Sequence, residues 1–384
     1  MTNTDITTDT TAPGLALHWF LPTYGDSRGI TAGGHGAGRH IGERPADLRY
    51  LTQLALAAEA NGFDSVLTPT GLWCEDAWLT TAALIGRTER LRFLVAVRPG
   101  LTSPTLAAQQ AQTFQELSGG RALINVVVGG EDAEQRAYGD HVDKAGRYAR
   151  ASEHLDVIRA LWEHDGPVDY DGEHVHVEGA ELRVKPKTAP PIFFGGSSDA
   201  GIAVAGRHAD VYLTWGEPPA AVAEKLDRVR AAAEPHGRTP EFGIRLHVIT
   251  RDTEEEAWAE AARLLDGVDP EEVRRIQEGL ARSQSEGQRR QAELHGRGAL
   301  LGDDVRDLEV SPNLWAGVGL IRGGAGTALV GSHEQVAERL DEYRRIGIGH
   351  VVLSGYPHLE ETYRVGEGLV PALEARGIPV SGRA

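Results

Sequence analysis

Cysteine is almost absent from this sequence, which has one among 384 residues. A single cysteine excludes a disulfide within the chain and any zinc or iron–sulfur site built from several cysteines. Basic residues are also outnumbered, because 39 Lys and Arg stand against 56 Asp and Glu, a net charge of −17. A chain this acidic has no basic footprint for DNA, RNA or anionic lipid.

Long apolar runs are missing too. No run approaches the roughly 20 residues that a membrane-spanning helix needs. The first residues, MTNTDITTDTTAP, have no basic segment followed by an apolar one, which excludes a secretory signal. These absences predict a cytoplasmic protein with a polar, disordered leader over residues 1–13.

What the chain does contain is a series of short apolar segments, separated by stretches with helical spacing of apolar residues. Continuous apolar segments are typical of parallel strands covered by helices. Eight strand–helix units in a chain of this length predict a (β/α)8 TIM barrel with insertions. An open doubly wound sheet is the alternative, but no G-x-G-x-x-G follows the first segment. The eight segments are residues 15–21, 64–68, 91–97, 121–128, 191–194, 210–215, 242–249 and 350–354.

The domain organisation follows from the same pattern. We expect one barrel domain over residues 14–379 and a short tail over 380–384. Between the seventh strand and its closing helix lies a long insertion, about residues 251–331, with a charged helical stretch and then a Gly-rich stretch. An insertion of this length between two barrel elements is usually functional, often as a lid.

Arg245 and His247 are the sharpest candidate pair, because the active site of such a barrel lies at the carboxyl ends of its strands. They stand two residues apart on the seventh strand, so their side chains share a face. A buried arginine is unfavourable unless it meets an anion or a carboxylate. The pair therefore indicates either an anion site or a structural ion pair.

Other candidates each have two interpretations. The segment 195–198, Gly-Gly-Ser-Ser, is either a phosphate cradle or a plain helix cap by Ser198 or Asp199. Arg322 is a mobile clamp on an anion or a solvated loop arginine. Cys74 is a nucleophile or redox group, or an inert buried residue.

No metal is expected. His174 and His176 share a probable strand, but no carboxylate ligand pattern accompanies them. Trp215 and Tyr356 stand at strand ends, where aromatic residues line a pocket or belong to the core. The residues alone indicate a barrel that binds an anionic small molecule.

Longer strings at these strand ends are more specific. They resemble the two-component, FMN-dependent alkanesulfonate monooxygenases of the bacterial luciferase-like family, over about residues 17–376. The strings are Trp19–Asp26, Pro69–Trp78, Phe93–Pro99, Phe194–Ser198, Tyr212–Pro219, Gly243–Val248, Ser311–Gly319, Arg322–Ala328 and Leu353–Glu361.

The resemblance implies a TIM barrel that uses FMNH2, supplied by a separate NAD(P)H-dependent FMN reductase, and O2. The implied reaction cleaves the C–S bond of an organosulfonate, releasing sulfite and an aldehyde for sulfur assimilation. It also implies a homo-oligomer, a dimer or a tetramer. Two alternatives stay open: a monooxygenase of this family acting on a sulfone or a sugar sulfonate, and a barrel that binds flavin or an anion without catalysis.

Residue by residue, the resemblance assigns catalysis and cofactor binding to matching positions. Arg245 and Arg322 suit the sulfonate, because a planar guanidinium matches an oxyanion. His247 and Tyr356 suit proton transfer or hydrogen bonding to flavin oxygen. The implied catalytic set is Cys74, Trp215, Arg245, His247, Arg322 and Tyr356, and the implied cofactor set is Thr70, Ala96, Asn125, Tyr148, Gly196, Ser197 and Ser198.

The sequence also departs from the family pattern. Leu72 and Trp73 precede Cys74 where simpler members have small or polar residues, and the loop Ser27–Arg44 is longer and Gly-rich. Barrel geometry places both changes at the rim of the pocket. They leave open whether the substrate is a bulky, linear, aromatic or sugar-like sulfonate.

Overall fold

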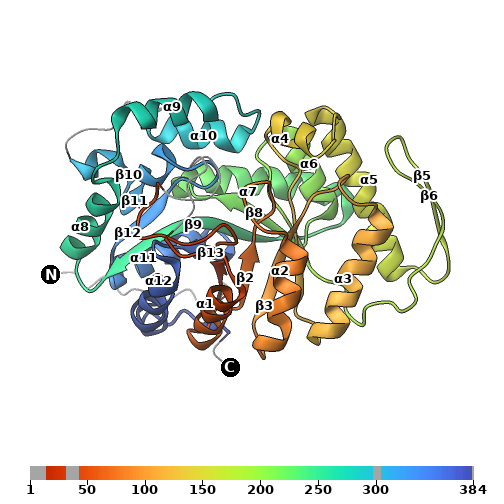
Figure 1. Cartoon of the computed structure of the whole chain (residues 1–384), viewed down its shortest axis with the longest axis horizontal. Coiled ribbons are helices and arrows are strands. Elements are labelled where there is room, and N and C mark those ends of the chain that lie inside the picture. Colours follow the sequence, from red (N-terminus) through yellow and green to blue (C-terminus); the bar gives the residue numbers. More distant parts are fainter. Residues whose placement is uncertain (1–13, 32–42, 297–303, 383–384) are drawn as a thin grey trace.

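Eight parallel strands close into a barrel. The computed structural model of the protein describes residues 14–31, 43–296 and 304–382, so the predicted leader lies outside the described residues (Figure 1). Each strand bonds to the next, and the last returns to the first, which confirms the TIM barrel. In order the strands are β1 (Leu15–Phe20), β2 (Ser65–Thr68), β3 (Arg92–Val97), β4 (Ala122–Val126), β7 (Ile192–Phe194), β8 (Val211–Trp215), β9 (Glu241–Arg251) and β13 (Ile348–Ser354).

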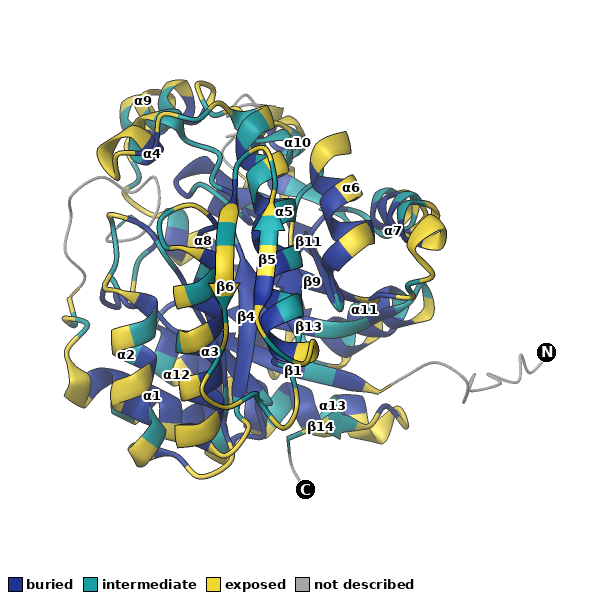
Figure 2. Ribbon diagram, turned by 90° about the vertical axis from the view of Figure 1, so that its right-hand side faces the viewer, coloured by how far each residue is buried: buried dark blue, intermediate teal, exposed yellow. Residues whose placement is uncertain are grey.

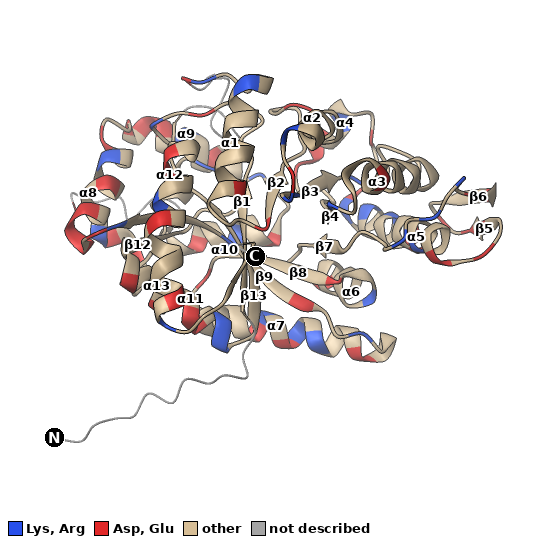
Figure 3. Ribbon diagram, turned by 90° about the horizontal axis from the view of Figure 1, so that it is seen from below, with Lys and Arg blue, Asp and Glu red and all other residues tan. Residues whose placement is uncertain are grey.

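Helices surround these strands, and their charged residues lie mainly on the outside, while the strands carry few (Figure 3). Local sequence fixes the ends of these helices: the Ser103 side chain accepts from the Leu106 N–H, and Gly119 closes the same helix with a left-handed φ of 66°. The surrounding helices are α1 (Leu48–Ala60), α2 (Ala77–Leu84), α3 (Pro104–Ser118), α5 (Lys144–Glu163), α6 (Asp199–His208), α7 (Pro219–Ala233), α11 (His333–Arg345), α12 (His358–Arg364) and α13 (Val370–Ala375).

The main core lies between the strands and the helices, and a smaller apolar layer fills the barrel itself (Figure 2). In the inner layer, Leu67, Leu94 and Leu123 stand side by side in the parallel register of β2, β3 and β4. Because branched side chains fill the barrel interior, a ligand site can form only beyond them, at the carboxyl ends of the strands.

The insertion after β9 builds a separate cap on the barrel. Its charged stretch forms three helices, α8 (Glu254–Leu265), α9 (Pro270–Leu280) and α10 (Glu286–Leu294). Three short strands, β10 (Glu309–Ser311), β11 (Leu314–Trp315) and β12 (Ala328–Ser332), then extend the sheet, with β12 parallel to the outer half of β9. Figure 1 shows α9 and α10 together at one end of the barrel.

Smaller elements complete the chain. A hairpin of β5 (Val168–Asp171) and β6 (His176–Ala180) projects from one side, and α4 (Asp132–Ala137) follows β4 (Figure 1). The segment Val380–Ser381, which the sequence places in a tail, is the strand β14 and pairs with β1. Among the described residues, no helix has both the length and the apolar character to cross a membrane.

A buried ion-pair network fastens the cap to the barrel. The Glu217 carboxylate, 3% exposed, accepts from Lys225 Nζ at 2.7 Å and from Arg290 Nε on α10 at 3.0 Å. Lys225 Nζ also donates to Thr214 Oγ1 on β8 at 2.8 Å. Burial lowers the pKa of Lys225 despite this carboxylate, so the ammonium depends on its partners.

We predict that Glu217→Leu destabilises the fold by about 3–5 kcal/mol, because it leaves the Lys225 ammonium buried without a carboxylate. Urea unfolding followed by circular dichroism measures the change. The double variant Glu217→Leu/Lys225→Met should recover much of the loss. Glu293→Ala, which removes an exposed partner of Arg289, serves as the control and should change stability by less than about 1 kcal/mol. A loss no larger than this control would show that the network does not stabilise the cap.

Candidate active site

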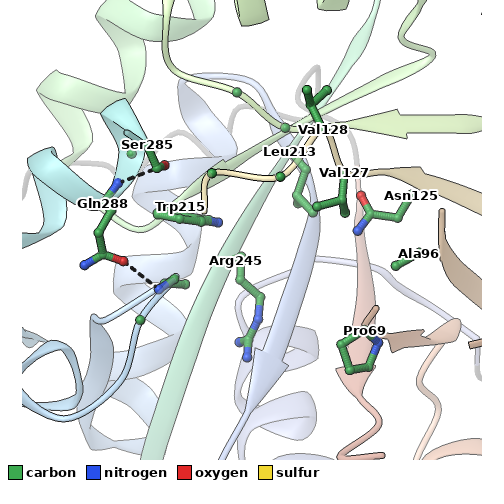
Figure 4. A pocket seen from close by; sticks show the side chains of 18 of the residues that line it. Pro69, Ala96, Asn125, Val127, Val128, Leu213, Trp215, Arg245, Ser285 and Gln288 are labelled. Carbon is green, nitrogen blue, oxygen red and sulfur yellow. Dashed lines mark hydrogen bonds between the residues drawn. The ribbon is translucent and has the colours of Figure 1, made fainter. Parts of the chain in front are cut away.

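A cavity of about 340 Å³ lies at the carboxyl ends of the barrel strands. This volume is within the range of about 300–1,000 Å³ usual for ligand pockets. Figure 4 shows Asn125 of β4, Leu213 and Trp215 of β8 and Arg245 of β9 around one space. The cap completes the wall, since residues 283 and 285–288 and the loop 322–325 also line the cavity.

Most residues that the sequence singles out meet at this cavity. Their assigned roles stay predictions, but their convergence is a finding. The lining includes Thr70, Ala96, Asn125, Tyr148, Gly196, Ser197, Ser198, Trp215, Arg245, His247, Arg322 and Tyr356.

Arg245 is buried and holds its charge without a carboxylate from the described residues. Its Nη1 donates to the Leu246 carbonyl, and its Nη2 donates to Ser354 Oγ at 2.7 Å. The guanidinium carbon lies 4.9 Å from the centre of the Phe20 ring. Burial lowers the pKa of Arg245 to about 10, which leaves it a cation at neutral pH. The described residues therefore do not form the structural ion pair that was the alternative for Arg245. An anion in the cavity would supply the negative charge that the guanidinium lacks.

Ser354 connects Arg245 to His247. Its Oγ lies 2.7 Å from His247 Nδ1, and His247 Nε2 lies 3.0 Å from the Ala325 carbonyl. A carbonyl only accepts, so Nε2 carries the proton and Nδ1 accepts from the Ser354 hydroxyl. The Ser354 oxygen in turn accepts from Arg245. The hydrogen bonds therefore all run in one direction: Arg245 donates to Ser354, and Ser354 donates to His247. His247 in turn donates to the Ala325 carbonyl, which joins the barrel to the cap.

These hydrogen bonds restrict what His247 can do. Both ring nitrogens are bonded to the protein, and the ring stacks on Tyr356 with centroids 5.5 Å apart. Burial, with Arg245 close by, holds the pKa of His247 well below 6.5. In this conformation His247 is a neutral group that orients its neighbours, and proton transfer by it would first require the Ala325 loop to move.

Arg322 is also buried, with 4% of its surface exposed. Its Nε donates to the Ile30 carbonyl at 2.6 Å, and its guanidinium lies over the rings of Tyr24 and Tyr356. The interpretation as a solvated loop arginine is therefore wrong. The loop that carries Arg322 is held from α10, because Gln288 Oε1 accepts from the Gly324 N–H at 2.9 Å (Figure 4).

The start of α6 offers a place for a phosphate. Ser198 caps the helix by accepting from the Gly201 N–H at 3.2 Å, so the cap interpretation is correct for this residue. Ser197 and Gly196 line the cavity beside it. A Cβ on Gly196 would lie 3.2 Å from Gly201 Cα and 3.4 Å from Tyr148 Oη, so glycine lets this loop approach the start of α6 and Tyr148 closely.

Cys74 differs from the other candidates, because it is not among the residues that line the cavity. Its Sγ lies 3.5 Å from the Gly71 carbonyl. Burial raises the pKa of the thiol to about 12, so it carries its proton at neutral pH. The placement favours the interpretation as an inert residue, and a role in the reaction stays a prediction.

Several residues of the site do not stand out in the sequence. Ser354 looks like any small strand residue, yet the strand register places it directly opposite His247. Tyr24 and Arg98 belong to the motifs Trp19–Asp26 and Phe93–Pro99, but only the fold brings them to the cavity. Arg98 Nη2 bonds to Glu134 on α4 at 2.8 Å, a contact between distant segments that has no sequence signal.

Within the described part of the chain, no group of three or more His, Cys, Asp or Glu side chains is placed to hold a metal ion.

We predict that stability falls as the pH drops below about 6.5, partly through His247. Its folded pKa is lowered, so the unfolded chain binds a proton that the folded chain excludes. This contribution is full above pH 6.5 and decreases by up to about 1.4 kcal/mol per pH unit below it. Urea unfolding at pH 7 and pH 5.5 should show a smaller loss of stability in His247→Gln than in the unsubstituted chain, because other buried histidines still contribute. The exposed His141, changed to Gln, should leave this loss unaltered. An unchanged loss in His247→Gln would contradict a neutral, buried imidazole.

The comparisons with known proteins agree with this fold. A riboflavin lyase structure with modified FMN and riboflavin has 21% identity and a TM-score of 0.78, covering 97% of this chain and 94% of that one. The EDTA monooxygenase of Chelativorans sp. BNC1 has 22% identity and a TM-score of 0.75, covering 97% and 96%. A long-chain alkane monooxygenase has 20% identity and a TM-score of 0.74, covering 96% and 92%. At these identities the likeness shows the fold.

The family assignment rests on sequence. The family model for luciferase-like monooxygenases matches residues 16–350, which is most of the chain. This span contains Arg245, His247 and Arg322, and it ends just before Ser354 and Tyr356. The chain therefore belongs to the luciferase-like monooxygenase family.

Proposed function

We propose that this chain is an FMNH2-dependent monooxygenase that cleaves the C–S bond of an organosulfonate, releasing sulfite and an aldehyde. The observation that carries the proposal is the buried Arg245 guanidinium, which lines the cavity and has no carboxylate partner among the described residues. A sulfonate fits this position, because its oxygens accept charge-assisted hydrogen bonds from a guanidinium.

The cavity also fits FMN. Ser197, Ser198 and the open backbone at Gly196 would hold the phosphate, with Tyr148 beside them. Thr70, Ala96 and Asn125 would line the ring system along β2, β3 and β4. Reduced FMN, when bound, would supply the electrons that activate dioxygen, so that one of its oxygen atoms reaches the substrate. A separate NAD(P)H-dependent reductase would supply the reduced FMN.

The residues of the chain would bind the substrate and exclude water. Arg245 and Arg322 would hold the sulfonate, and Tyr356, which stacks on His247, would present its hydroxyl to the reacting region. The loop 322–325 and α10 would close the cavity, so that water does not divert the activated oxygen. The resemblance in sequence also supports a homo-oligomer, either a dimer or a tetramer.

The second candidate is a monooxygenase of the same family with a different kind of substrate. It is favoured by the diversity of the structural neighbours, which are named for EDTA, an alkane and riboflavin. Sulfite release distinguishes the two. The chain, FMN, a reductase and NAD(P)H should release sulfite from at least one member of a broad sulfonate panel. No sulfite from any member would reject sulfonate cleavage.

We predict that Arg245→Met weakens sulfonate binding by about 1.5–3 kcal/mol, the range for losing a charged hydrogen bond. Isothermal titration of the protein with a sulfonate that gives sulfite measures the change. FMN affinity should stay nearly constant, because the phosphate site at α6 is unaltered.

A matched control is Arg263→Met, which removes an exposed arginine paired with Glu260 on the cap. This variant should bind the sulfonate as the unsubstituted chain does. Equal sulfonate affinity in Arg245→Met and Arg263→Met would show that Arg245 does not bind the anion.

A further inference from the structure

One side of the cavity is built from aromatic rings. We call Phe20, Tyr24 and Trp73 the aromatic wall; all three line the cavity. Ring centroids lie 5.4 Å apart for Tyr24 and Trp73 and 6.2 Å apart for Phe20 and Tyr24, tilted by 54° and 49°. These three rings, from the end of β1, the loop after it and the β2–α2 connection, thus adjoin one another.

Both arginines of the proposed anion site pack on rings of this side. Arg245 lies over Phe20 at 4.9 Å, and Arg322 lies over Tyr24 at 5.7 Å. Arg322 also lies over Tyr356 at 5.3 Å, so its guanidinium contacts two phenol rings. Because the rings cover the faces of these guanidinium groups, a hydrogen-bond acceptor must approach in the plane of each guanidinium, where its N–H groups point.

The wall is neutral as well as aromatic. Burial raises the pKa of Tyr24, so its hydroxyl keeps its proton. Glu134, an acid that lines the cavity, is already engaged by Arg98 at 2.8 Å and by the Leu72 N–H at 3.0 Å. Ring faces suit another ring, because aromatic pairs gain energy beyond the area they bury.

We propose that the substrates are arylalkanesulfonates, whose ring packs on Trp73 of the aromatic wall while the sulfonate meets Arg245 and Arg322. This inference rests on the proposed function and names its substrate class. The sulfonate-bearing carbon must carry hydrogens, since the product is an aldehyde. The balanced reaction is R–CH2–SO3⁻ + O2 + FMNH2 → R–CHO + HSO3⁻ + FMN + H2O. The C–S bond and one C–H bond break and a C=O bond forms. FMNH2 provides the two electrons that reduce the second oxygen atom to water, and the proton lost from carbon, with those of FMNH2, ends in hydrogensulfite and water.

The test compares two sulfonates with equal carbon number, 3-phenylpropane-1-sulfonate and nonane-1-sulfonate. Sulfite release gives kcat/KM for each, with reductase, FMN and NAD(P)H present. We expect a preference of about three- to tenfold for the aryl compound, the range that ring packing supplies. Trp73→Leu should abolish the preference, and Trp73→Phe, which keeps a ring, should retain part of it. Leu72→Ala, an exposed neighbour, is the control and should keep it in full.

A binding measurement keeps this inference separate from the reaction. Calorimetric titration of the flavin-free protein with the two sulfonates should show the same aryl preference, lost in Trp73→Leu. Equal kcat/KM for both compounds, or an equal loss for both in Trp73→Leu, overturns the inference and leaves sulfonate cleavage standing. If no sulfonate yields sulfite, the proposed function fails. Tighter binding of the phenyl compound that depends on Trp73 would still support the aromatic subsite. Equal binding of both compounds would overturn the aromatic subsite as well.

Discussion

A cation buried without a carboxylate is the constraint on which the site depends. Arg245 remains charged near neutral pH, yet its partners in the described chain are carbonyl and hydroxyl oxygens. Neutral oxygens satisfy the N–H groups but leave the charge itself uncompensated, so the arrangement is favourable mainly when an anion enters. The barrel supplies the position, because β9 and β13 place Arg245, His247 and Ser354 on one face at the same end.

The cap depends on the same arrangement. The Ala325 carbonyl accepts from His247, so the Gly-rich loop bonds directly to the residues that orient Arg245. Gln288 holds that loop from α10, and Glu217 joins α10 to the barrel through Arg290. Polar contacts therefore connect the anion site, the loop and the cap. A change in the position of the loop would alter the hydrogen bonds that orient Arg245.

The fold was predictable because apolar periodicity reports directly on burial, and each of the eight predicted strands overlaps a barrel strand. The strands β10, β11 and β12 were not, since two to five residues carry too little pattern, and their pairing with β9 comes from tertiary contact. Arg245 and His247 were found because their spacing is local. Ser354 and the Arg98–Glu134 pair depend on register and on packing between distant segments. Cys74 entered the catalytic set through the family resemblance, it is not among the residues that line the cavity, and its role stays a prediction.

The most direct test of this account is a crystal structure of the protein with FMN and a bound sulfonate. The account predicts sulfonate oxygens at about 2.7–2.9 Å from the Arg245 guanidinium nitrogens, the distance of charged hydrogen bonds. It also predicts Ser354 still bonded to both Arg245 and His247. A sulfonate bound elsewhere, with Arg245 turned toward a carboxylate of the chain, would contradict it.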